Sequence, residues 1–408
     1  MITTAMRIQN LPPYLFARID KIKQDALREG IDLIDLGVGD PDVSPPKAVV
    51  DALVAGVSEA GSHHYSSYDG LPGLRISFAE WFKKRFAVTL NPHTEVLPLL
   101  GSKEGIGHIF FSHVDPGDEV LIPDPGYPVY TAGTIMAGAV PKYFPLRREN
   151  GFLPDIGELE AIVTPKTKMM WLNYPSNPTT VMATMEMFTA VVAFARDHGI
   201  MVCHDAAYSE IAFDGATAGS MLQVPDAREV GIEFHSLSKT FCMPGWRVGF
   251  IVGNADIIEA LARVKTNLDS GIFLPVQRAA MTALSDCRDD TKEIRNIFEA
   301  RRNFFVNGLK SLGWDLPMPS STFYVWAPVP GTGTSMEFCM LLLKNAGIVA
   351  TPGVGFGDNG EGYVRMSLTV SDERLEEALT RIKKMNLDGF VKSPISALRC
   401  ISRHCGVP

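Results

Sequence analysis

The segment EVGIEFHSLSKTFCMPGWRVGF, residues 229–250, joins an apolar run to a polar break. In the break, Lys239 stands between Ser238 and Thr240, and Arg247 follows behind Pro-Gly-Trp. A lysine between small hydroxyl residues is, by itself, typical of a surface loop. The segment therefore indicates a function only if similar breaks occur elsewhere in the chain.

The succession of apolar run, polar break and helical pattern recurs through the first two thirds of the chain. Apolar strands that alternate with helices favour crossover units and a mostly parallel sheet. Strands buried on both faces of such a sheet should be apolar throughout, as these runs are. We therefore predict an α/β fold with a mostly parallel central sheet flanked by helices. The other breaks are GSKEG (101–105), DPGYP (124–128), NYPSNPT (173–179) and DAAYSEI (205–211).

The last third of the chain follows a different order. A long amphipathic helix is predicted over 291–313, followed by short strands separated by helices, which favours a smaller α+β domain. The helix over 14–30 and the strand over 31–37 are expected to pack with it. We divide the chain into an N-terminal arm with part of the small domain (1–45), a large domain (46–284), a small C-terminal domain (285–390) and a tail expected to be disordered (391–408).

Composition and charge exclude several classes of protein. The chain has 408 residues, 38 of them basic and 46 acidic, and no basic run suited to a nucleic-acid backbone. No apolar run reaches the length of a membrane helix, and no export signal opens the sequence. Six scattered cysteines without a C-x-x-C pair predict a reduced, cytoplasmic protein. Cys400, His404 and Cys405 lack a second ligand cluster, so we predict no metal.

Three short motifs point to other chemistry and lack their required context. SLSK (236–239) fits the S-x-x-K nucleophile motif of penicillin-recognising hydrolases, but S-D-N and K-T-G elements are missing. GFGDNG (355–360) fits the dinucleotide motif G-x-G-x-x-G, but a strand pattern follows it instead of a helix, which indicates a loop between strands. SKT (238–240) lacks the preceding glycine of a P-loop.

The breaks contain the groups that an electrophilic pyridine aldehyde requires. Such a molecule needs a lysine to hold it as a Schiff base and a carboxylate to keep its ring nitrogen protonated. Its phosphate needs donors, best supplied by a helix N-terminus and an arginine, and its ring needs a flat neighbour. These requirements are met by Lys239, Asp205, Ser102, Arg247 and Tyr127.

Four motifs of the chain resemble those of a known family. NYPSNPT, HDAAYSEI (204–211), the segment around Lys239, and GYVRMSL (362–368) are similar to motifs of the class I/II, fold-type I aminotransferases that depend on pyridoxal 5'-phosphate. The resemblance extends from residue 11 to residue 379, in family order and at family spacing. Within the family the chain most resembles the bacterial LL-diaminopimelate aminotransferases. The resemblance implies amino-group transfer between an amino acid and a 2-oxo acid, both small molecules, by a ping-pong mechanism.

The resemblance implies roles for the residues that would face the cofactor, within the large domain. Lys239 would carry the cofactor and move the proton at the substrate α-carbon. Asp205 would pair with the ring nitrogen, and Tyr208 and Asn177 would bind the ring oxygen. Tyr127 would stack on the ring. The phosphate would be held by Ser102, Ser236, Ser238, Arg247 and the backbone at Lys103.

The resemblance also implies substrate contacts and a partner subunit. Arg365 would bind the substrate α-carboxylate as a planar fork. Gly39 would let the backbone approach the substrate, with Tyr14 at the mouth of the site and Asn177 beside the substrate. Tyr65 would reach the phosphate of the neighbouring subunit, which implies a homodimer with shared sites.

Two positions, Tyr68 and Asn267, bear on recognition of the distal end of the substrate. Plant-type diaminopimelate enzymes carry a glutamate three residues after the tyrosine that matches Tyr65, and here that position is Tyr68. Asn267 is the candidate for a distal contact. An alanine–glutamate aminotransferase and a C–S β-lyase share most of these motifs and stay open as alternatives.

Overall fold

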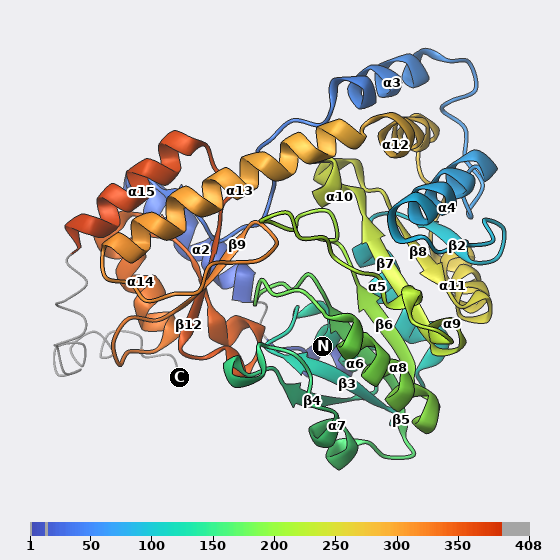
Figure 1. The fold of residues 1–408 in the computed structure, drawn as a ribbon, viewed down its shortest axis with the longest axis horizontal. Coiled ribbons are helices and arrows are strands. Elements are labelled where there is room, and N and C mark those ends of the chain that lie inside the picture. Colours follow the sequence, from blue (N-terminus) through green and yellow to red (C-terminus); the bar gives the residue numbers. More distant parts are fainter. Residues whose placement is uncertain (1, 13–14, 386–408) are drawn as a thin grey trace.

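The computed structural model describes residues 2–12 and 15–385 (Figure 1). Tyr14 lies outside this part of the chain, and so does the tail 391–408 with the cysteines and histidine considered above. Among the described helices, none is long and apolar enough to cross a membrane.

A seven-stranded sheet forms the centre of the larger lobe. Its strand order is β2 (Val96–Leu99), β8 (Gly249–Gly253), β7 (Gly231–Ser236), β6 (Met201–Asp205), β5 (Thr167–Asn173), β3 (Glu119–Asp124) and β4 (Val140–Pro145). Only β8 runs antiparallel to its neighbours in this sheet, whereas the pairs from β7 through β4 are all parallel. The predicted mostly parallel sheet is therefore confirmed.

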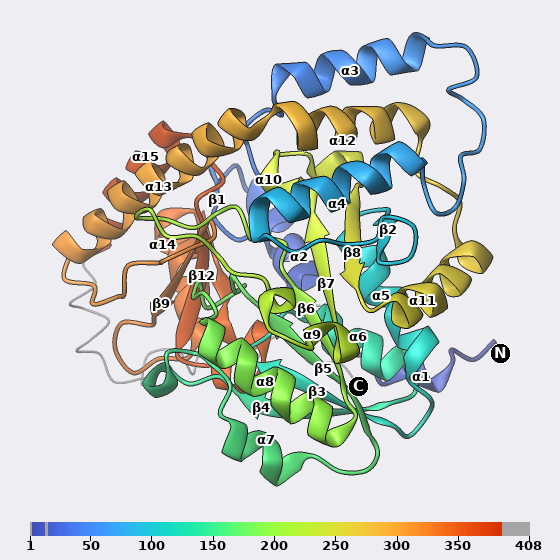
Figure 2. The same ribbon diagram turned by 45° about the vertical axis from the view of Figure 1, so that its right-hand side comes forward.

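Helices cover both faces of this sheet, as the uniformly apolar strands require (Figure 2). On one face α4 (Pro72–Phe86), α8 (Met185–His198) and α12 (Leu274–Asp286) pack over side chains such as Leu121 and Met170. On the other, α5 (Ser102–His113), α6 (Val129–Met136) and α11 (Ala255–Leu268) pack over their sequence neighbours Ile122 and Trp171. Successive strand residues thus enter two separate cores.

The smaller lobe is built from both ends of the chain. Its antiparallel sheet has the order β11 (Thr351–Pro352), β12 (Tyr363–Ser367), β9 (Tyr324–Pro328), and β1 (Ile34–Asp35) pairs in parallel with β10 (Ile348–Val349). Ala26 of α2 (Leu15–Arg28) packs against Leu343 of α14 (Ser335–Ala346). The N-terminal helix and strand therefore join the C-terminal lobe. The domain boundaries given above stay predictions.

The long helix α13 (Arg288–Ser311) links the lobes, running from beside α12 across to the smaller lobe (Figure 1). It packs there against α15 (Asp372–Lys384). GFGDNG forms two short turns, η4 (Gly353–Phe356) and η5 (Asp358–Gly360), between β11 and β12, which confirms the loop predicted for it. The remaining elements are α1 (Met6–Gln9), α3 (Lys47–Ser58), η1 (Arg148–Asn150), α7 (Ile156–Ile162), η2 (Met221–Gln223), α9 (Ala227–Val230), α10 (Leu237–Thr240) and η3 (Pro244–Trp246).

Candidate active site

A cavity of about 400 Å³ lies where the carboxyl ends of β5, β6 and β7 meet the smaller lobe. This is the edge at which parallel sheets bind ligands. The cavity brings together most of the residues singled out from the sequence. Those that line it are Gly39, Ser102, Lys103, Tyr127, Asn177, Asp205, Tyr208, Ser236, Ser238, Lys239, Arg247 and Arg365.

Lys239 enters the cavity from the short helix α10, which Ser236 caps by accepting a hydrogen bond from the backbone N–H of Ser238. Its ammonium donates to the carbonyl oxygen of Gly39 at 2.8 Å. No ion pair within the described residues involves this lysine. Burial lowers the pKa of Lys239 to about 8, and the charge of Asp40 only partly opposes this shift. A buried amine of this kind is readily neutral and nucleophilic.

One end of the cavity is suited to an anion. Ser102 and Lys103, the first residues of α5, line this end together with Arg247, and the N-terminus of a helix favours an anion. Gly101, which precedes α5, has a positive φ of 80°, and a Cβ at this position would overlap the Arg247 side chain. Burial, followed by the charge of Arg247, lowers the pKa of Lys103. The crowding of positive groups indicates that this end accepts a phosphate-like ligand.

The cavity is also lined by a buried carboxylate, that of Asp205. Tyr130 of α6 donates a hydrogen bond of 2.9 Å to Oδ2 of Asp205, and the Tyr130 ring stacks on Trp171. Burial raises the pKa of Asp205, whereas the bond from Tyr130 opposes that shift. Asn173 donates to the Asp205 carbonyl and accepts from the backbone N–H of Asn177. The carboxylate is thus fixed in position, and because no ion pair with it occurs among the described residues, it suits a positively charged ligand.

Tyr130 and Asn173 were not predicted as site residues. Asn173 opens the motif NYPSNPT, and Tyr130 is the second residue after DPGYP. The available signal was a second tyrosine three positions after Tyr127, since the turn that opens at Tyr127 brings the two ring centres to 5.9 Å.

The smaller lobe supplies the remaining wall. Arg365 of β12 is 3% exposed and donates to Oδ1 of Asn177 at 2.8 Å and to the carbonyl of Gly37 at 2.7 Å. Its guanidinium lies 4.2 Å from the ring centre of Tyr324. A Cβ on Gly39 would overlap the Tyr324 hydroxyl, so close approach of the backbone requires glycine here. Tyr324 also lines the cavity and was not predicted.

Two predicted residues lie away from the cavity of this chain. Tyr65 is 91% exposed, in the segment between α3 and α4. Asn267 is exposed on α11, where its side-chain amide donates to the Arg263 carbonyl. Neither residue lines the cavity, so any role there would require a second chain.

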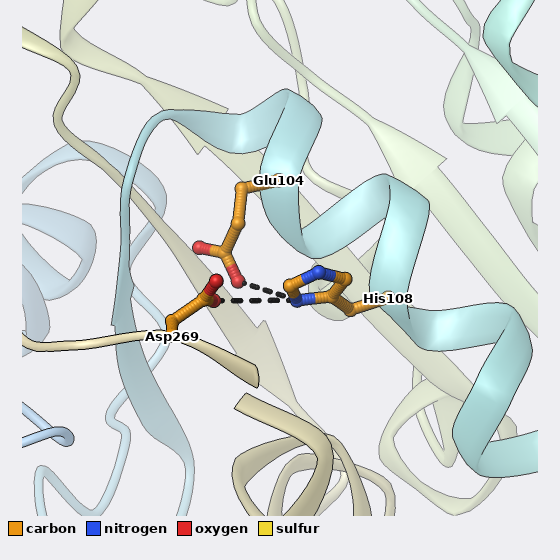
Figure 3. A group of neighbouring side chains, drawn as sticks. All are labelled: Glu104, His108 and Asp269. Carbon is orange, nitrogen blue, oxygen red and sulfur yellow. Dashed lines mark hydrogen bonds and ion pairs between the residues drawn. The ribbon is translucent and has the colours of Figure 1, made fainter. Parts of the chain in front are cut away.

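A group of three ionisable side chains stands behind the anion-binding end (Figure 3). His108 of α5 lies 2.9 Å from Glu104 and 3.4 Å from Asp269. Glu104 also accepts from the backbone N–H of Leu100. The ammonium of Lys265, whose side chain is 1% exposed, reaches Glu104 at 3.2 Å and Asp269 at 3.5 Å. Because Lys265 supplies positive charge to both carboxylates, the group is an ion-pair network that ties α5 to α11.

Comparison with known proteins identifies the family. The family model for aminotransferase class I and II matches residues 31–382. The chain belongs to this family. Curated LL-diaminopimelate aminotransferases from Moorella thermoacetica and Desulforudis audaxviator are 50% and 51% identical, covering 93% of this chain and 98% and 97% of theirs.

Solved structures agree with this assignment. A substrate-bound BacF from Bacillus subtilis has a TM-score of 0.91 at 39% identity, with 95% of this chain and 98% of that chain covered. A Thermus thermophilus aspartate aminotransferase has a TM-score of 0.89 at 28% identity, with 94% of this chain and 100% of that chain covered.

The protein is a pyridoxal-phosphate-dependent aminotransferase, and its cavity fits that cofactor. The buried amine of Lys239 suits an aldehyde, and the Asp205 carboxylate suits a protonated ring nitrogen. The α5 N-terminus with Arg247 suits a phosphate.

Proposed function

We propose that this aminotransferase moves the amino group of LL-diaminopimelate to 2-oxoglutarate, a step of lysine biosynthesis, as a homodimer with shared sites. The substrate assignment is supported by relatives named LL-diaminopimelate aminotransferase, which are 50% and 51% identical to this chain and cover 93% of it. The cytoplasmic location inferred from the cysteines stays a prediction.

The roles of the residues in the cavity follow from their chemistry. When bound, pyridoxal phosphate supplies an electron sink that makes the α-proton of the amino acid acidic. Lys239, whose pKa of about 8 leaves it readily neutral, would take that proton and deliver it to the cofactor carbon on the other side of the transferred nitrogen. Asp205 holds the proton on the ring nitrogen, and Tyr127 covers the ring. Ser102, Ser236, Ser238, Arg247 and the backbone of Lys103 hold the phosphate.

The substrate is oriented by Arg365 of the smaller lobe and by the residues that surround it in the cavity. Arg365 lines the cavity, and each of its terminal nitrogens carries a second N–H besides the one donated to Asn177 or Gly37, so the planar guanidinium suits an α-carboxylate. Asn177, held by Arg365, and Tyr208 face the ring oxygen, and Gly39 leaves room beside Lys239. The role expected of Tyr14 at the mouth of the site belongs to the same proposal, although this residue lies outside the described part of the chain.

The homodimer part of the proposal is supported by the exposure of one aromatic segment. Tyr65, with Tyr68 close by in the chain, projects from the surface although both are large rings. A partner subunit would cover them, bring Tyr65 to its phosphate and offer Asn267 to the distal end of its substrate.

The substrate is tested by single half-reactions. Purified cofactor-loaded protein is mixed separately with LL-diaminopimelate, alanine, aspartate and glutamate, and the change in cofactor absorbance is followed by stopped flow. We expect LL-diaminopimelate to convert the cofactor with the highest kcat/KM, and glutamate to convert it as the other substrate. Rapid conversion by alanine without conversion by LL-diaminopimelate would support the alanine–glutamate alternative instead. Release of pyruvate or thiol from a sulfur amino acid would support the β-lyase.

A further inference from the structure

Tyr324 touches three parts of the active site at once. It lies at the start of β9 and is 3% exposed. Its hydroxyl oxygen is 3.0 Å from the hydroxyl oxygen of Tyr208. Its ring lies under the guanidinium of Arg365, and its hydroxyl occupies the space that a side chain at Gly39 would need. A residue with these contacts can influence both the cofactor end and the carboxylate end of the site.

The register of the small sheet explains the contact with Arg365. Tyr324 pairs with Ser367 on β12, and Arg365 is two residues from Ser367. Side chains two apart on a strand share a face, so Tyr324 and Arg365 are diagonal neighbours on the face toward the cavity. The Tyr324 ring therefore packs against the Arg365 guanidinium, and this cation–π contact stabilises the guanidinium in its position.

The pair of hydroxyls imposes an order on its protons. Each phenol has one proton to donate, and it can also accept. If Tyr208 donated to Tyr324, it would have no proton left for a ligand in the cavity. Tyr208 can donate into the cavity only while it accepts the proton of Tyr324, so the direction of this one bond decides what Tyr208 offers.

We propose that Tyr324 is a positioning residue for transamination: its hydroxyl donates to Tyr208 and directs the Tyr208 proton to the cofactor ring oxygen, while its ring holds Arg365 for the substrate carboxylate. This inference rests on the proposed roles of Tyr208 and Arg365. Burial and the neighbouring Tyr324 hydroxyl both raise the pKa of Tyr208, so Tyr208 keeps its proton at working pH. One side chain thereby couples two functions that lie on different lobes.

Tyr324→Phe separates the two parts, because it removes the hydroxyl and keeps the ring. The bond that Tyr208 accepts from Tyr324 polarises the Tyr208 hydroxyl and makes it a stronger donor. Without that bond Tyr208 donates more weakly, so the ring oxygen keeps more negative charge and holds the neighbouring proton more tightly. We expect the visible band of the resting, cofactor-loaded protein to titrate about half a unit to one unit higher than in the unsubstituted protein. The KM for the amino acid should change less than about twofold, since Arg365 keeps its support.

Two further variants sharpen the test. Tyr208→Phe should raise the same titration more, and the double variant with Tyr324→Phe should match Tyr208→Phe alone, because the second hydroxyl acts only through the first. Tyr324→Leu should also raise KM about tenfold by removing the ring. Tyr143→Phe, a half-exposed phenol on β4, is the control and should leave both quantities unchanged.

Other outcomes would overturn the inference. If Tyr324→Phe lowered the melting temperature but titrated like the unsubstituted protein, the hydroxyl would be structural only. Additive shifts in the double variant would mean that Tyr324 does not act through Tyr208. The titration needs no amino acid, so a wrong substrate assignment leaves this test intact, whereas failure of the substrate proposal appears only in the half-reactions.

Discussion

At the scale of single residues, Lys239 shows how burial prepares a side chain for chemistry. Its amine is held by one carbonyl oxygen, that of Gly39, and by no carboxylate of the described chain at ion-pair distance. Removing water disfavours the ammonium, and Arg365 and Arg247 add to the effect. The lysine therefore has a lowered pKa without a special acid or base beside it.

This shift predicts the pH dependence of cofactor attachment. Only the neutral amine attacks an aldehyde, and a pKa of about 8 means that half of the lysine is neutral near pH 8. In cofactor-free protein, the rate of covalent attachment of pyridoxal phosphate should rise with pH and level off above about pH 8. Stopped-flow absorbance measures this rate. A rate that still rises in proportion to hydroxide up to pH 10 would show that Lys239 has an ordinary pKa, and Lys239→Ala should give no attachment.

At the scale of elements, the N-terminus of α5 lines the cavity, and side chains of the same helix hold it against α11. Its N-terminus faces the anion-binding end, and Glu104 in its first turn pairs with Lys265 of α11. His108, one turn further on, lies beside Glu104 and Asp269, the residue that follows α11 (Figure 3). The pKa of Glu104 is lowered to about 2, since its partners outweigh the cost of burial. The pKa of His108 is raised, chiefly by its hydrogen bond to Glu104.

The network predicts a pH-dependent effect of His108→Gln on stability. A histidine whose folded pKa is raised stabilises the protein fully below its unfolded pKa of about 6.5, and this contribution is lost as pH rises through the folded value. The substitution should therefore lower the melting temperature by about 1–3 °C at pH 6 and by less at pH 9. Differential scanning fluorimetry at both pH values measures it.

His113 provides a matched control on the same helix. Burial lowers its pKa, so its neutral form is favoured in the folded protein and the sign reverses. Relative to the unsubstituted protein, the melting temperature of the His113→Gln variant should therefore be higher at pH 6 than at pH 9. Equal pH dependence of the two variants would contradict the assignment of the His108–Glu104 pair.

At the scale of the whole molecule, the site depends on two lobes and, in our proposal, on two chains. The large sheet positions Asp205 and Lys239, and the smaller lobe adds Arg365. Tyr65 stands exposed away from this chain's own cavity. A site completed by a partner subunit would explain an exposed aromatic ring that the chain itself does not cover.

Mixed dimers test the shared site. Lys239→Ala and Tyr65→Ala proteins should each be nearly inactive or strongly impaired. In a mixed dimer, one site receives both substitutions and the other receives neither, so randomly mixed subunits should recover about a quarter of full activity. Activity is measured after refolding of equal amounts together. Recovery no greater than the sum of the separate variants would mean that Tyr65 acts within its own chain or not at all.

Much of the fold and of the cavity could be predicted from the sequence, for a local reason. Strands buried on both faces must be apolar throughout. Consecutive apolar residues such as Leu121 and Ile122 therefore predict a sheet covered on both faces, independently of the rest of the chain. Parallel strands end at one edge, so the polar residues that follow them, such as Asn177, Asp205 and Lys239, are brought together by the topology alone.

Only the tertiary structure decided which groups complete the site. Tyr130 meets Asp205, and Tyr324 meets Tyr208, Arg365 and Gly39, through contacts between elements far apart in the chain. Nothing in the local pattern distinguishes these tyrosines from ordinary core aromatics, because their partners are set by how helix, sheet and lobe pack. The amino-acid order determined the chemistry available at the sheet edge, and packing determined the direction in which each hydroxyl, guanidinium and carboxylate points.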